Sequence, residues 1–196
     1  RRFIANVFAA SKLKKLRGRI IKFNPKLVNS NRYIPLLGDG SLGGKGRGLA
    51  FLSNFIENVY LKKLIPDLHV AIPKTAVIGV NEFDNFLENN NLYDVIFEDK
   101  EYNHVLEAFR TARLSEQLRN NLRKYLQVMT KPLAVRSSGL FEDSLNQPFA
   151  GVYSTYLLPN NHPDIERRLE DVENAIKLVF ASIYSPESRA YFNVID

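Results

Sequence analysis

The 196-residue chain contains no cysteine, no tryptophan and a single methionine. Without cysteine it can form no disulfide framework, no thiolate metal site and no thiol nucleophile. No apolar run approaches the about 18 residues that cross a bilayer, and no secretory signal is visible. These absences are typical of a cytoplasmic protein, and we expect that location and no contact with a membrane.

Acidic residues are absent from residues 1–38, which carry ten lysines and arginines. The net charge of +6 is therefore a property of this one segment. Apolar residues at three- or four-residue spacing predict a basic amphipathic helix within residues 1–30, broken before Pro25. Nucleic acid, an anionic membrane or an acidic partner could bind such a helix. We favour a basic arm or interdomain linker over residues 1–32, because no nucleic-acid motif accompanies it.

We expect residues 33–196 to be the N-terminal portion of one domain. The chain begins Arg-Arg rather than with methionine, which we interpret as a piece of a longer polypeptide. The remaining pattern mixes short strands with helices, so the expected fold class is α+β. Strands are predicted at 33–37, at 69–80 with an interruption at Pro73, at 133–135 and within 152–158. Helices are predicted at 82–88 with Asn81 as N-cap, in two or three pieces over 92–128 with a cap at Ser115, at 163–184, and from Pro186 onward. Their spacing predicts inward-facing apolar residues, among them Phe86, Leu87, Leu118, Leu122, Leu169 and Val172.

Glycine is concentrated in one place, since six of the ten glycines fall within residues 38–48. Lys45 lies in this loop, and a helix is predicted from Leu49 to about Leu64 with Leu49, Leu52, Phe55 and Ile56 among its inner residues. A glycine loop that opens a helix suits phosphate, because free N–H groups and the positive end of the helix dipole point the same way. The Walker A pattern fails at Gly46, and the dinucleotide pattern lacks its acidic partner. The alternative is a flexible turn with a solvated lysine.

A second polar group follows the apolar run 133–135. Arg136, Ser137 and Ser138 come where that strand ends, and a glycine turn at Gly151 leads into the β-rich run 152–158. A guanidinium fork beside a glycine turn suits an anion. The alternative is a hairpin in which Arg136 pairs with Glu142 or Asp143. We do not expect those two carboxylates to hold a metal.

The stretches AVRSSGLFEDS…FAGVYSTYL and GGKGRGLA, with the strand and helix at 72–87 between them, resemble the ATP-binding domain of phosphoenolpyruvate synthase and pyruvate phosphate dikinase. Rifampicin phosphotransferase and the glucan dikinases share this signature. The resemblance implies the first subdomain of an ATP-grasp-type fold, a mixed or antiparallel sheet flanked by helices. It implies that Lys45 and Arg136 are catalytic phosphate contacts. It adds nucleotide contacts from Gly44, Ser137, Gly151 and Thr155.

The resemblance also implies a reaction. ATP would donate a phosphoryl group to a carrier histidine on another domain, which passes it to pyruvate in phosphoenolpyruvate synthase. ATP, Mg²⁺ and the phosphohistidine and acceptor domains of the same polypeptide would be the partners, with the Mg²⁺ ligands in a second subdomain after residue 196. This piece alone would be inactive, and His69, His104 and His162 do not resemble the carrier. Pro148 and Val152-Tyr153 depart from the pattern. The alternatives are a regulatory or interaction module that kept the fold, or a related dikinase acting on an antibiotic or a glucan.

Overall fold

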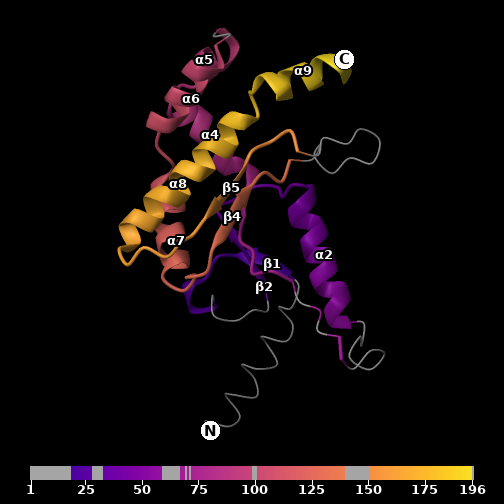
Figure 1. The fold of residues 1–196 in the computed structure, drawn as a ribbon. Coiled ribbons are helices and arrows are strands. Elements are labelled where there is room, and N and C mark those ends of the chain that lie inside the picture. The colour runs from indigo at the N-terminus through magenta and orange to yellow at the C-terminus, as the bar shows by residue number, and fades with distance from the viewer. Residues whose placement is uncertain are drawn as a thin grey trace.

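The computed structural model describes residues 19–27, 33–58, 67–68, 70, 72–98, 101–139 and 151–195. Figure 1 shows two small sheets and a set of helices, a mixed architecture that is compatible with the expected α+β class. The elements in chain order are β1 Arg19–Lys22, the 3-10 helix η1 Pro25–Leu27, β2 Tyr33–Leu37, α2 Gly44–Asn58, β3 Val77–Ile78, α4 Val80–Asn89, α5 Tyr93–Glu98, α6 Tyr102–Thr111, α7 Glu116–Leu126, β4 Leu133–Arg136, β5 Thr155–Leu158, α8 Ile165–Ser182 and α9 Pro186–Ile195.

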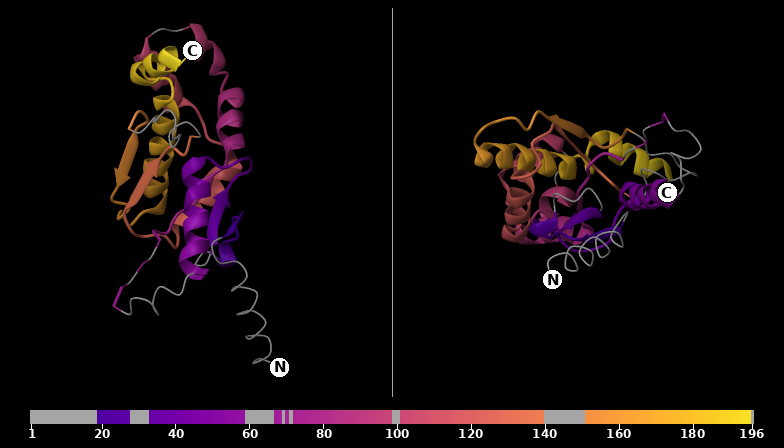
Figure 2. Two further views of the ribbon diagram at one scale, coloured as in Figure 1. Left: turned by 90° about the vertical axis from the view of Figure 1, so that its right-hand side faces the viewer. Right: turned by 90° about the horizontal axis from the view of Figure 1, so that it is seen from below.

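The described strands form two separate sheets rather than the single mixed or antiparallel sheet that we expected. Strands β1, β2 and β3 form a parallel sheet in that order, with Arg19 opposite Tyr33 and Leu37 opposite Ile78. Strands β4 and β5 form an antiparallel pair. The two sheets have different helical partners: α2 lies beside β1, whereas α8 packs against β4 and β5 (Figures 1 and 2).

The prediction of a helix over residues 1–30 is wrong for its described part. Residues Arg19–Lys22 form β1, and residues 25–27 form a short 3-10 helix. Pairing with the buried strand β2 overrides the helical spacing of the apolar residues. The strand is continued by Phe23, whose N–H donates to the carbonyl of Leu36 at 3.0 Å. Residues 1–18 lie outside the described residues.

The core lies between α4, α6, α7 and α8. It is centred on fully buried apolar side chains of these helices, among them Phe86, Phe109, Leu118, Leu126 and Leu169. Helix α8 is packed on one side against α6 and α7 and on the other against β4 and β5 (Figure 1). The predicted cap at Ser115 is confirmed, since its Oγ accepts the N–H of Leu118 at 3.1 Å.

Three boundary predictions differ from the structure. The N-cap of α4 is Gly79 rather than Asn81, because the helix begins at Val80, whose N–H donates to the carbonyl of Ser41. Of the strand predicted at 69–80, the described residues form only Val77–Ile78. Helix α2 begins five residues earlier than predicted, and its supposed inner residues Leu52 and Phe55 are about half exposed (49% and 50%).

Candidate functional site

The glycine-rich segment 38–48 leads into the first turn of α2, and Lys45 is the second residue of this helix. The helix starts at Gly44, and its first backbone bond runs from the N–H of Arg47 to the carbonyl of Gly43 at 3.1 Å. The Arg47 Nε donates to the carbonyl of Leu42 at 3.0 Å, which holds the preceding loop against the helix. The N–H groups of the first residues have no partner within a helix, so this end can accept an anion.

The glycine loop meets the end of β4. The N–H of Gly46 donates to the Oγ of Ser138 at 3.0 Å, although the two residues are 92 positions apart in the sequence. At Gly43 the two segments come so close that a Cβ would overlap the backbone carbonyl of Ser138. Only glycine permits this approach. The structure therefore brings together the two polar segments that the sequence singles out separately.

Strand pairing places two predicted site residues side by side. Arg136 is directly opposite Thr155 in the antiparallel pair of β4 and β5, and both are exposed. Val135 and Tyr156, one position along each strand, are half-buried. Because side chains alternate between the two faces of a strand, Arg136 and Thr155 share the face that α8 does not cover.

The turn before β5 needs glycine for its backbone. Gly151 has a φ of +83°, and a Cβ there would meet nothing within 4 Å, so conformation rather than space selects glycine. Two residues later Tyr153 is buried and lies against Gly139, where an added Cβ would stand 3.3 Å from the ring. The ends of β4 and β5 are thus packed together. Residues 140–150, including Glu142, Asp143 and Pro148, lie outside the described residues.

The two predicted cations differ in accessibility. The Nζ of Lys45 is buried from solvent, whereas Arg136 is exposed. An acidic residue near the loop, Asp39, forms an exposed ion pair with Lys22 at 3.0 Å. The described residues contain no group of three or more histidine or acidic side chains that could hold a metal ion. The helix start and the guanidinium of Arg136 are groups that suit an anion.

Ser137 and Ser138 differ in their contacts. The Ser137 Oγ accepts the N–H of Gly139 at 3.1 Å, which closes a local turn. Ser138 is the residue that reaches the glycine loop. The prediction that Ser137 contacts the nucleotide concerns a different role and stays a prediction. The contact of Ser138 with the glycine loop was not predicted, because two adjacent serines give no signal of which one faces a partner 92 residues away.

The described histidines do not lie in this site. The Nδ1 of His162 accepts the N–H of Asp164 at 3.1 Å, just before α8, and His104 lies exposed on α6. His69 lies outside the described residues.

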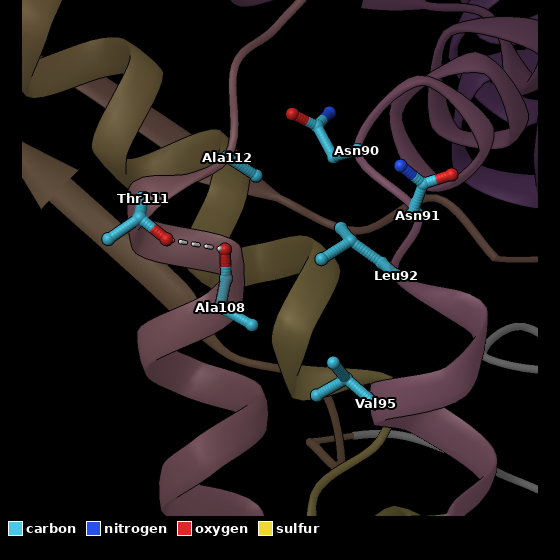
Figure 3. Close-up of a pocket in the computed structure, with 7 residues that line it drawn as sticks. All are labelled: Asn90, Asn91, Leu92, Val95, Ala108, Thr111 and Ala112. Carbon is cyan, nitrogen blue, oxygen red and sulfur yellow. Dashed lines mark hydrogen bonds between the residues drawn. The ribbon is translucent and has the colours of Figure 1, made fainter.

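A cavity of about 300 Å³ lies elsewhere, between the end of α4, the start of α5 and the C-terminal half of α6 (Figure 3). None of the predicted site residues lines it. One of its polar lining residues, Asn90, has a packing role: the amide nitrogen donates to the carbonyls of Phe86 at 2.8 Å and Arg113 at 3.0 Å, and the amide oxygen accepts the N–H of Arg113. We do not assign this cavity to the function.

In the described ranges, no helix combines the length and the apolar character needed to cross a bilayer. Comparison with curated proteins gave no match. Comparison with solved structures gave none either. The family model of the pyruvate phosphate dikinase AMP/ATP-binding domain matches residues 39–194, a range that contains the glycine loop, β4 and β5. The chain belongs to this family of nucleotide-binding domains, and it is the ATP-binding part of a phosphotransferase related to pyruvate phosphate dikinase.

Proposed function

We propose that the phosphates of ATP bind between the first turn of α2 and the ends of β4 and β5. In this proposal the chain is the first subdomain of an ATP-grasp-type unit. The unit belongs to a phosphoenolpyruvate-synthase-like dikinase, which transfers a phosphoryl group to a carrier histidine on another domain and then to pyruvate. A different acceptor, such as an antibiotic or a glucan, would use the same ATP site.

One observation carries the proposal. The contact of Gly43 and Gly46 with Ser138 joins a helix start that suits an anion to a strand that ends in an exposed arginine. A bound triphosphate at this junction would meet backbone N–H groups, the helix dipole and a guanidinium fork at once. Phosphoryl transfer depends mainly on positioning and charge neutralisation, which these groups supply.

The residues have different tasks in the proposed site. Arg136 would bind phosphate oxygens with two donors, and Thr155, beside it on the same face, would add a hydroxyl. Gly44 would contribute its N–H, while Gly151 would let the turn before β5 close over the phosphates. The Lys45 ammonium is buried, so its contact with a phosphate requires the side chain to rotate outward, which its flexible four-carbon stem allows.

Mg²⁺, when bound, would supply positive charge that offsets the charge of the phosphates. The described residues contain no carboxylate cluster for it. We propose, as the family resemblance implies, that its protein ligands lie in the second subdomain.

The test is a calorimetric titration of the chain with ATP and Mg²⁺. Arg136→Ala and Lys45→Ala should each weaken binding about tenfold or more, because each removes a charge-assisted contact. Arg167→Ala is the matched control, since it removes an exposed arginine of α8 whose partner is Glu170 on the same helix. It should leave the affinity unchanged.

Two results would contradict the proposal. Equal affinities for the unaltered chain and both variants would place the nucleotide elsewhere. No nucleotide affinity, either in this chain or in a polypeptide extended beyond residue 196, would favour a regulatory or interaction module that kept the fold.

A further inference from the structure

We propose that Ser138 is a positioning residue that fastens the start of α2 to the end of β4 and so fixes Lys45 relative to Arg136. The inference rests on the proposed function, in which both cations serve one triphosphate. It assigns to Ser138 a contact with the protein's own glycine loop.

The hydroxyl of Ser138 does for α2 what an N-cap side chain does for other helices. Gly46 is the third residue of α2, so its N–H has no acceptor within the helix. The Ser138 Oγ accepts that N–H at 3.0 Å. A serine cap usually comes from the residue just before the helix, whereas this one comes from 92 positions later in the chain. The hydrogen bond therefore both caps the N-terminus of α2 and connects α2 to the segment that follows β4.

Ser138 also contacts Gly43, three residues before Gly46. The backbone of Gly43 lies so close to the Ser138 carbonyl that any side chain at position 43 would displace it. Ser138 is thus held from both directions, by its carbonyl at Gly43 and by its hydroxyl at Gly46. Because Lys45 lies between these two glycines and Arg136 lies two residues before Ser138, the contact sets the relative placement of the two backbones.

The neighbouring serine cannot take over this task. The Ser137 hydroxyl accepts the N–H of Gly139 within its own turn. Removal of the Ser138 hydroxyl would leave the N–H of Gly46, a buried residue, without this acceptor and so loosen the first turn of α2. The lysine and the arginine would then bind a phosphate chain more independently of one another.

The first measurement follows amide hydrogen exchange of Gly46 by NMR, without nucleotide. Ser138→Ala should raise the exchange rate of this amide about two- to tenfold, the equivalent of one hydrogen bond. Ser138→Thr, which keeps the hydroxyl, should retain protection. Thr111→Val is the matched control: it removes a hydroxyl that donates only to carbonyls of its own helix, α6.

The second measurement is a double-mutant cycle of Lys45→Ala and Arg136→Ala, read as affinity for inorganic tripolyphosphate and for ATP. In the unaltered background the two losses should be non-additive. In the Ser138→Ala background they should become additive to within about twofold, and Ser138→Thr should restore the coupling. A merely structural serine would lower the stability without changing this coupling.

The outcomes separate the two proposals. Unchanged exchange at Gly46 in Ser138→Ala, or unchanged coupling despite faster exchange, would overturn the role of Ser138 while ATP binding stands. Failure of both the unaltered chain and a polypeptide extended beyond residue 196 to bind tripolyphosphate or ATP would overturn the proposed function, and the positioning role with it.

Discussion

At the scale of single residues, Phe109 shows how much one side chain contributes to the core. It is fully buried, with ring centroids 5.4 Å from Phe86 and 5.9 Å from Tyr184. Phe109→Ala should lower the free energy of unfolding by about 3–5 kcal/mol, because it leaves a cavity that the helices cannot fill. Urea denaturation measures the change. Phe97→Ala is the control: this phenylalanine is 80% exposed, and its loss should cost less than about 0.5 kcal/mol.

Ser115 is a second residue whose side chain makes two stabilising hydrogen bonds. Its Oγ accepts the N–H of Leu118 and donates to the carboxylate of the buried Glu82 at 2.8 Å. Ser115→Ala should destabilise the protein by about 1–2 kcal/mol, through loss of the cap and of a donor to Glu82. Ser115→Asp, ordinarily an equally good cap, should be worse, because it sets two carboxylates against each other. Thermal unfolding at neutral pH ranks them, and an Asp variant as stable as the parent would contradict the Glu82 contact.

At the scale of elements, ion pairs join α7 to α8. Two nitrogens of the Arg123 guanidinium donate to Glu166, at 2.6 Å and 2.9 Å, and Arg119 donates to Glu173 at 2.6 Å. The hydrogen bond from Arg123 lowers the pKa of Glu166 below its usual 4.5. A carboxyl with a lowered pKa in the folded state stabilises the protein fully above its unfolded pKa. It loses that contribution as the pH falls through the folded value.

We therefore expect Glu166→Gln to destabilise the protein at pH 7 but to make a progressively smaller difference below pH 4.5. Denaturation midpoints of both proteins across this pH range measure the effect. A gap between the two proteins that stays constant down to pH 3 would show that the charge of Glu166 does not contribute. High salt should shrink the gap at pH 7, since the pair is partly exposed.

At the scale of the whole molecule, the structure bears on where the domain begins. We predicted an arm or linker over residues 1–32, yet β1 pairs with β2 from Arg19 opposite Tyr33 to Lys22 opposite Leu36. Removal of residues 1–18 should leave the unfolding temperature within about 2 °C. Removal of residues 1–32 should lower it by more than about 5 °C, because β2 loses its partner strand. Equal unfolding temperatures for the two truncated chains would place the boundary at residue 32, as predicted.

The sequence predicted most of the helical part of this fold. The spacing of Phe86 and Leu87, of Leu118 and Leu122, and of Leu169 and Val172 indicated the buried faces of α4, α7 and α8, and all six are buried. Residues close in the chain determine such patterns. The pattern failed for Leu52 and Phe55 on α2, which are about half exposed, because helical spacing shows that a face is apolar but not what covers it.

Part of the candidate site could be predicted from the sequence and part could not. Its residue types could be predicted, because a lysine among glycines and an arginine at a strand end suit phosphate whatever surrounds them. The glycine at 151 also had a local reason, its φ of +83°. Whether Lys45 and Arg136 act on one triphosphate remains a prediction, for which the cycle with Ser138→Ala is the test.

The sequence by itself determined the family signature, the α+β class and the helical faces, since each depends on residues within a few turns of one another. Only the tertiary structure decided that β1 joins β2, that the described strands form two sheets, and that Ser138 rather than Ser137 holds the glycine loop. Those outcomes depend on contacts between segments far apart in the chain. Their partners are selected by packing and by the hydrogen bonds left open at helix and strand ends, which no local pattern encodes.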